Sequence, residues 1–120
     1  MHTLVLGATT NPNRIAFQAI HRLVNQGYPV SAVGIRHGEV AGIPIQQGMP
    51  ELEDIHTITL YLNPQRQEPY YDYILGLKPK RIIFNPGTEN VQLMRLAEEA
   101  GIEVEIACTL VMLATREYAK

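Results

Sequence analysis

The chain contains one cysteine, carries little net charge and lacks a long hydrophobic run. A single cysteine, Cys108, excludes an intrachain disulfide and a cysteine-based metal cluster, which suits a cytoplasmic protein. With a net charge of −2, the chain lacks the excess of basic residues that is typical of nucleic-acid-binding proteins. This charge does not exclude a local basic pocket. Neither a signal peptide nor a membrane span is indicated, because the longest apolar runs are only strand-sized. We therefore expect one soluble cytoplasmic domain over residues 1–120, with no nucleic-acid or membrane partner.

Short apolar runs alternate in the sequence with stretches of helical periodicity. The predicted strands lie, by residue number, at 3–6, 30–33, 42–45, 57–62, 81–84 and 103–107. The predicted helices lie at 12–26, 65–76, 89–100 and 109–116, the third of them capped by Thr88. Pro69 is unfavourable inside the second helix, so we expect the helix proper to begin near this residue. Because Pro44 cannot serve two neighbouring strands, its strand is expected at the edge of the sheet.

This alternation predicts an α/β fold, a Rossmann-like three-layer sandwich with helices on both faces of the sheet. The sheet is expected to be mostly parallel and five-stranded, in the order 3-2-1-4-5, counting the strand with Pro44 as the third. That order gives no place to the strand at 103–107.

The first strand and helix are joined by Gly7-Ala8-Thr9-Thr10-Asn11-Pro12-Asn13-Arg14. Such a junction binds anions, because backbone N–H groups and the helix dipole point at the space above it. The loop departs from the dinucleotide pattern G-x-G-x-x-G, since Thr9 and Pro12 replace the second and third glycines. We predict that Thr9, Thr10 and Arg14 hold phosphate oxygens. The alternative is that Arg14 is a solvated residue of the first helical turn.

Three Asn-Pro pairs follow three different predicted strands: Asn11-Pro12, Asn63-Pro64 and Asn85-Pro86. Because parallel strands share one carboxyl edge, these turns predict a shaped ligand site there, although Asn-Pro is also an ordinary turn dipeptide. After the second strand, Gly34-Ile35-Arg36 lacks the acid that holds the ribose of NAD. An arginine suits an extra ribose phosphate, as in NADP or coenzyme A; the alternative is a plain surface arginine.

Groups that commonly perform catalysis are sparse. The four histidines show no metal-ligand spacing, so we expect no metal site, although His37 is a candidate phosphate contact. The two aspartates, Asp54 and Asp72, lie away from the expected binding edge, and Ser31 lies within a strand, so no catalytic residues are indicated. Cys108 closes the last strand at that edge, either as a reactive thiol or as a small apolar residue.

The chain resembles the small CoA-binding-domain proteins, which are similar to the CoA-binding domain of succinyl-CoA synthetase α subunits. The segments that carry the resemblance are residues 7–14, Gly27-Tyr28-Pro29-Val30, residues 40–45, Leu62-Asn63-Pro64, Asn85-Pro86-Gly87 and Ala100-Gly101-Ile102. The resemblance implies a Rossmann-like fold with the CoA phosphates on the first loop and the adenosine near the second and fourth strand ends. Two segments depart from the family pattern, Val33-Gly34-Ile35-Arg36 and Ala107-Cys108-Thr109-Leu110.

The resulting expectation is a non-enzymatic protein that binds CoA or an acyl-CoA. The alternatives are an NADP-type redox protein and an interaction module without a ligand. No protein partner is indicated. If Cys108 is reactive, incubation with CoA disulfide produces a mixed disulfide that mass spectrometry detects. The predicted ligand contacts are Gly7, Ala8, Thr9, Thr10, Asn11, Arg14, Ile15, Gly34, Arg36, Asn63, Pro64, Asn85, Pro86 and Gly87.

Overall fold

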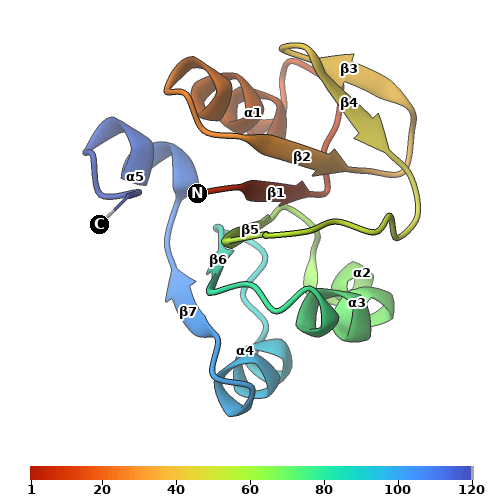
Figure 1. Cartoon of the computed structure of the whole chain (residues 1–120), viewed down its shortest axis with the longest axis vertical. Coiled ribbons are helices and arrows are strands. Elements are labelled where there is room, and N and C mark those ends of the chain that lie inside the picture. Colours follow the sequence, from red (N-terminus) through yellow and green to blue (C-terminus); the bar gives the residue numbers. More distant parts are fainter. Residues whose placement is uncertain (120) are drawn as a thin grey trace.

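The computed structural model describes residues 1–119. Seven strands form one sheet in the order β3-β4-β2-β1-β5-β6-β7 (Figure 1). The strands are β1 Thr3–Leu6, β2 Val30–Val33, β3 Gly38–Val40, β4 Ile43–Gln46, β5 Thr57–Leu60, β6 Arg81–Phe84 and β7 Glu103–Ile106. Neighbouring strands are parallel except for β3 and β4, which form an antiparallel hairpin. The predicted α/β, Rossmann-like fold is confirmed.

The predicted strand order forms the centre of this larger sheet, so the count of five was too low. The five ordered strands correspond to β4-β2-β1-β5-β6. β7 adds one edge beside β6, and β3 adds the other beside β4. The expectation that Pro44 marks an edge strand is therefore wrong. Its strand, β4, pairs with β2 only at Ile45 and Gln46, beyond the proline, while Pro44 faces Glu39 of β3.

Helices cover both faces of the sheet (Figure 1). They are α1 Ile15–Asn25, α2 Pro64–Gln67, the 3-10 helix η1 Glu68–Tyr70, α3 Tyr71–Gly76, α4 Val91–Glu99 and α5 Thr109–Ala114. Within β1, Leu4 and Leu6 pack toward the core beneath α3 and α4, whereas Val5 packs toward the core beneath α1 and α5. Strands buried on both faces in this way need continuous apolar sequence, which explains why β1 shows no alternation. Among residues 1–119, no helix is long and apolar enough to cross a membrane.

The loop before α1 is longer than predicted, because the helix begins at Ile15 rather than at Pro12. The Thr9 hydroxyl accepts a hydrogen bond from the N–H of Asn11 at 3.1 Å. The Asn11 side chain in turn accepts one from the N–H two residues on, at 3.0 Å. These two side-chain turns hold the segment out of helical geometry. As a result, Arg14 is the N-cap, with an extended backbone.

The start of α4 also differs from the prediction, since Asn90 and not Thr88 is its N-cap. The Asn90 side chain accepts a hydrogen bond from the N–H of Leu93 at 3.3 Å. The Thr88 hydroxyl instead donates to the carbonyl oxygen of Asn85 at 2.8 Å, which tightens the turn after β6. The helix predicted at 65–76 begins one residue earlier, at Pro64, and contains a 3-10 turn around Pro69.

Candidate functional site

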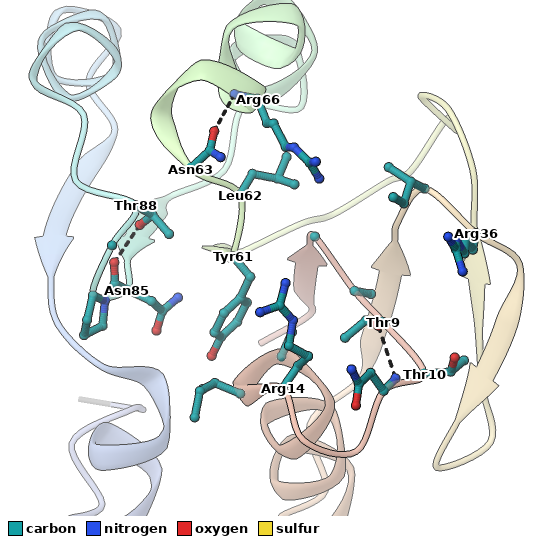
Figure 2. A pocket seen from close by; sticks show the side chains of 18 of the residues that line it. Thr9, Thr10, Arg14, Arg36, Tyr61, Leu62, Asn63, Arg66, Asn85 and Thr88 are labelled. Carbon is teal, nitrogen blue, oxygen red and sulfur yellow. Dashed lines mark hydrogen bonds between the residues drawn. The ribbon is translucent and has the colours of Figure 1, made fainter.

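A cavity of about 990 Å³ lies at the carboxyl ends of the strands, where ligands bind in open α/β sheets. The turns that follow β2, β1, β5, β6 and β7 line it, and Figure 2 shows most of the lining side chains. The lining residues are Gly7, Ala8, Thr9, Thr10, Asn11, Arg14, Ile15, Ala16, Ile35, Arg36, Tyr61, Leu62, Asn63, Arg66, Asn85, Pro86, Gly87, Thr88 and Cys108.

The structure brings the predicted ligand contacts together around this cavity, with two exceptions. Gly34 lies beneath the first loop, and Pro64 is the first residue of α2; neither lines the cavity. His37, the candidate phosphate contact, does not line it either. Cys108 does, as expected for the end of the last strand. Whether the lining residues bind a ligand remains a prediction.

Several lining residues were not predicted. Tyr61 and Leu62 were assigned to a strand, but β5 ends at Leu60 and leaves both at the carboxyl edge. Arg66 was assigned to a helix without a role. The Asn63 side chain accepts a hydrogen bond from the N–H of Arg66 at 2.9 Å, so the first turn of α2 places this arginine at the cavity. The Asn-Pro pair was the signal that could have located it. The other unpredicted lining residues are Ala16, Ile35 and Thr88.

The charges around the cavity have one sign. Arg14, Arg36 and Arg66 line it, and no aspartate or glutamate does. Within residues 1–119 an ion pair is formed by Arg81 with Glu105, and none by these three arginines. Figure 2 shows Arg14 and Arg66 extending into the same space from opposite walls, with Arg36 farther along. Unpaired guanidinium groups that share one concave surface favour an anionic ligand, because Arg binds phosphate oxygens through two parallel hydrogen bonds.

The N-terminus of α1 adds to this positive potential. Ile15 and Ala16, its first two residues, line the cavity. No side chain caps the helix, and its first turn holds no acidic residue. The free N–H groups and the positive end of the helix dipole therefore remain available to an anion.

Gly34 holds the first loop in place without touching the cavity. The N–H groups of Gly7 and Ala8 both donate to the carbonyl oxygen of Val33 at 2.9 Å. A Cβ atom at Gly34 would lie 2.3 Å from the carbonyl oxygen of Ala8. Only glycine permits this close approach of the two backbones, so Gly34 sets the position of the loop rather than contacting a ligand.

Asn85 uses its buried amide to join three strand ends. Its Nδ2 donates to the Thr59 hydroxyl at 2.7 Å and to the carbonyl oxygen of Leu60 at 2.8 Å. Its Oδ1 accepts from the N–H of Thr109, the first residue of α5, at 2.9 Å. The residue is 2% exposed. Asn85 therefore lines the cavity with an amide whose hydrogen bonds are internal.

A second buried amide, that of Gln67, links the turns after β5 and β6. Its Nε2 donates to the carbonyl oxygens of Leu62 and Thr88, each at 2.8 Å. Its Oε1 accepts from Nδ2 of Asn90 at 2.9 Å. Gln67 is fully buried, so this linkage is shielded from water.

Tyr61 lines the cavity, and its side chain has a strongly raised pKa. Burial raises the pKa of Tyr61 to about 12, although the nearby hydroxyls of Thr59 and Thr109 act in the opposite direction. Those two hydroxyls are hydrogen-bonded to each other at 2.8 Å. The Tyr61 hydroxyl itself is buried and has no hydrogen-bond partner within residues 1–119. Tyr61 is therefore a neutral phenol at physiological pH.

Replacing Tyr61 by phenylalanine should leave the free energy of unfolding at pH 7 unchanged within about 1 kcal/mol, or raise it, because a buried hydroxyl without a partner is lost. Above pH 10 the two proteins should diverge. A folded-state pKa of about 12 against 10 in the unfolded chain means that wild-type stability is lost between these values, by about 2–3 kcal/mol. Denaturant unfolding at pH 7 measures the first effect, and at pH 11, midway between the two pKa values, it measures about half of the second. Tyr73 and Tyr118, whose pKa burial also raises, are common to both proteins; an equal alkaline loss in both would contradict the assignment.

Known proteins resemble this chain over nearly its whole length. A sequence model described as "CoA binding domain" matches residues 2–114. The crystal structure of an uncharacterised protein is 50% identical, with a TM-score of 0.95, and the match covers 98% of this chain and 97% of that one. A Thermus thermophilus structure, cell-free ID.343, is 24% identical, with a TM-score of 0.85 over 98% and 90% of the two chains.

A hypothetical protein from Pyrococcus horikoshii OT3 is 23% identical, with a TM-score of 0.84 over 95% of this chain and 81% of that one. At 23–24% identity, the similarity to the Thermus and Pyrococcus structures shows only that they share this fold. No curated protein sequence matches the chain. The matched segment contains every residue that lines the cavity, including the three arginines and Cys108. The chain belongs to the CoA binding domain family.

Proposed function

We propose that this protein is a cytoplasmic, non-catalytic CoA-binding protein that takes CoA or an acyl-CoA. The ligand's phosphates would lie on the loop from Gly7 to Ala16 and at the N-terminus of α1. The observation that carries the proposal is the convergence of three unpaired arginines on one cavity that no carboxylate lines. Such a site is complementary to a ligand with several phosphate groups, and CoA carries a diphosphate and a ribose phosphate.

Two lining isoleucines support a nucleotide rather than inorganic phosphate. Ile15 is 49% exposed and Ile35 is 65% exposed, and both belong to the cavity. Large apolar side chains at a concave polar site gain stability when a flat apolar group such as adenine covers them. Each isoleucine is the sequence neighbour of a lining arginine, so apolar and phosphate contacts would come from the same turns.

Apart from the Cys108 thiol, the titratable groups of the cavity support binding rather than catalysis. The lining contains no histidine, aspartate or glutamate. Tyr61, the one lining phenol, has a pKa raised to about 12, which makes it a poor proton donor or acceptor near neutral pH. Arginine remains protonated throughout, so it binds charge and does not transfer protons.

An NADP-type dinucleotide is the second candidate ligand, and the position of Arg36 favours it. Arg36 follows β2 and lines the cavity, where an arginine can contact a ribose phosphate of either NADP or CoA. Isothermal titration calorimetry with CoA, dephospho-CoA, acetyl-CoA, NAD and NADPH separates the candidates. We expect CoA to bind, with a lower affinity for dephospho-CoA. Stronger binding of NADPH would favour the dinucleotide. If none of the five compounds bound, the result would favour the third alternative, an interaction module without a ligand.

Arg14→Ala should weaken CoA binding by about 1.5–3 kcal/mol, which is tenfold or more in the dissociation constant, because a charge-assisted phosphate contact is lost. Calorimetry measures the change. Arg22→Ala is the matched control: Arg22 lies within α1, the helix whose N-cap is Arg14, and it is exposed and outside the cavity. Equal affinities of Arg14→Ala and the wild type would refute a phosphate contact by Arg14.

A further inference from the structure

The chain after α5 is attached to the edge of the sheet opposite the cavity. We propose that this segment, residues 115–119 (the strap), opens as a unit and that its opening loosens α5, the helix that begins at the cavity. Arg81 binds the closed strap and transfers to Glu105 when the strap opens. No residue of the strap lines the cavity, and only the response of the strap to CoA rests on the proposed function.

Tyr118 attaches the strap to the sheet. It is 1% exposed, whereas residues 115–117 and Ala119 are exposed. Its hydroxyl is hydrogen-bonded to the hydroxyl of Thr3 at 2.6 Å, and Figure 1 shows the chain after α5 beside this end of β1. Nη1 of Arg81 donates to the Tyr118 carbonyl oxygen at 2.8 Å, and Cζ of Arg81 lies 4.6 Å from the centroid of the Tyr118 ring. Tyr118 is therefore the buried anchor of an otherwise exposed segment.

The turn between α5 and Tyr118 has an unfavourable backbone conformation. The N–H groups of Glu117 and Tyr118 both donate to the carbonyl oxygen of Met112, at 2.8 and 3.2 Å. To make this turn, Arg116 adopts a φ of 62°, in the left-handed region that helix ends usually assign to glycine. Opening of the strap unwinds this turn and relieves Arg116, so the closed state depends on the anchor at Tyr118.

Arg81 has a second partner close by. It is 3% exposed, and a buried guanidinium group that loses its partner is strongly destabilising. Its Nη1 lies 4.0 Å from Oε2 of Glu105, too far for a hydrogen bond. Nη2 of Arg81 and Oε2 of Glu105 are both buried, and neither has a hydrogen-bond partner in the part of the chain that the structure describes. Loss of the Tyr118 carbonyl frees Nη1 to close this gap, so the open strap leaves no unpaired charge behind.

The helix α5 connects the strap to the cavity. Its N-cap, Cys108, lines the cavity, and the N–H of Thr109 donates to Oδ1 of Asn85 at 2.9 Å. Its other end leads directly into the strap. Met112 and Leu113 are buried in the core, so release of the strap loosens α5 without removing it from the sheet. The cavity wall at Cys108 is therefore held in part from the opposite edge of the sheet.

Hydrogen exchange of the Glu117 and Tyr118 amides measures the opening, because both must leave the Met112 carbonyl to exchange. The amides of β1, at the centre of the sheet, give the baseline for global unfolding. Glu105→Gln should slow the exchange of the strap amides at least threefold relative to β1, since the open state loses the charged partner of Arg81. Faster or unchanged exchange would overturn the transfer of Arg81 to Glu105. Glu103→Gln is the matched control: Glu103 is exposed on the same strand, and its loss should leave the exchange unchanged.

Tyr118→Ala tests whether the strap opens separately from the rest of the protein. Loss of the anchor should speed the exchange of the strap amides tenfold or more relative to β1, with a smaller acceleration in α5. Equal acceleration in the strap and in β1 would show that Tyr118 belongs to the global core, and it would overturn the strap. If this variant does not fold, Tyr118→Phe, which loses only the bond to Thr3, should still speed the strap amides at least twofold relative to β1.

CoA tests the link between the strap and the cavity. A saturating concentration should slow the exchange of the strap amides at least threefold, because a ligand that fills the cavity favours the state in which α5 is held. Unchanged exchange in a sample that binds CoA by calorimetry would overturn the link. Absence of binding by calorimetry would instead overturn the proposed function, and the Glu105→Gln and Tyr118→Ala results would still decide whether the strap exists.

Discussion

Asn85→Ala should lower the free energy of unfolding by about 3–5 kcal/mol, because several buried groups lose their partner and each such loss costs about 1–3 kcal/mol. The Thr109 N–H loses its acceptor, and the Leu60 carbonyl and Thr59 hydroxyl lose a donor. All these groups lie where β5, β6 and α5 meet. Equilibrium unfolding in urea, followed by circular dichroism, measures the change.

Asn63→Ala is the matched control, since this asparagine also precedes a proline at a strand end. Its side chain is exposed and makes one N-capping hydrogen bond, so its loss should cost only about 1 kcal/mol. The contrast between the two variants tests whether burial decides the cost. Similar losses in both would show that Asn85 does not hold the strand ends together.

Gly34→Ala should destabilise the protein by about 3 kcal/mol, at the upper end of what added volume costs in a packed site. The new methyl group would lie 2.3 Å from the carbonyl oxygen of Ala8 and 3.1 Å from Cγ2 of the Ile45 side chain. The closer of these atoms belongs to the backbone, so it cannot move away as the end of a flexible side chain can. The first loop must therefore shift from its position on β2. Because we propose that this loop and the N-terminus of α1 hold the ligand's phosphates, CoA affinity should fall as well. Thermal unfolding and calorimetry on the same sample measure the two effects.

Gly76→Ala provides the comparison for this substitution. Gly76 ends α3, and a Cβ atom there would meet nothing within 4 Å. Alanine at this helical position should be neutral or stabilising by up to about 1 kcal/mol, since it reduces the entropy of the unfolded chain. A loss at Gly76 as large as that at Gly34 would mean that glycine flexibility, and not the contact with Ala8, explains the result.

The sequence predicted β1, β2 and β6 to the residue, but it made β5 two residues too long, at 57–62 instead of 57–60. Strands at the centre of a sheet are recognised from short apolar runs between turn residues. Thr3–Leu6, Val30–Val33 and Arg81–Phe84 each contain three apolar residues out of four. β3 was not predictable in this way. Its three residues, Gly38–Val40, contain one apolar residue, and only pairing with β4 makes them a strand.

The site was predictable as a place but not as a set of interactions. Parallel strands bring their ends to one edge, so Asn63 and Asn85 were expected near the first loop. Sequence alone does not show that the Asn85 amide makes its hydrogen bonds within the protein, because its partners belong to a neighbouring strand. Arg66 was missed for a related reason: the direction of its side chain depends on where α2 begins.

The linkage through Gln67 has a thermodynamic consequence for ligand binding. The turns after β5 and β6 are joined by a buried amide, so this wall of the cavity loses little conformational entropy when a ligand arrives. The opposite wall, from Thr9 to Arg14, is exposed apart from the half-buried Thr9, and it is shaped by two short side-chain turns. Most of the ordering cost of association therefore falls on those six residues, and the affinity of the site can be tuned there without disturbing the core.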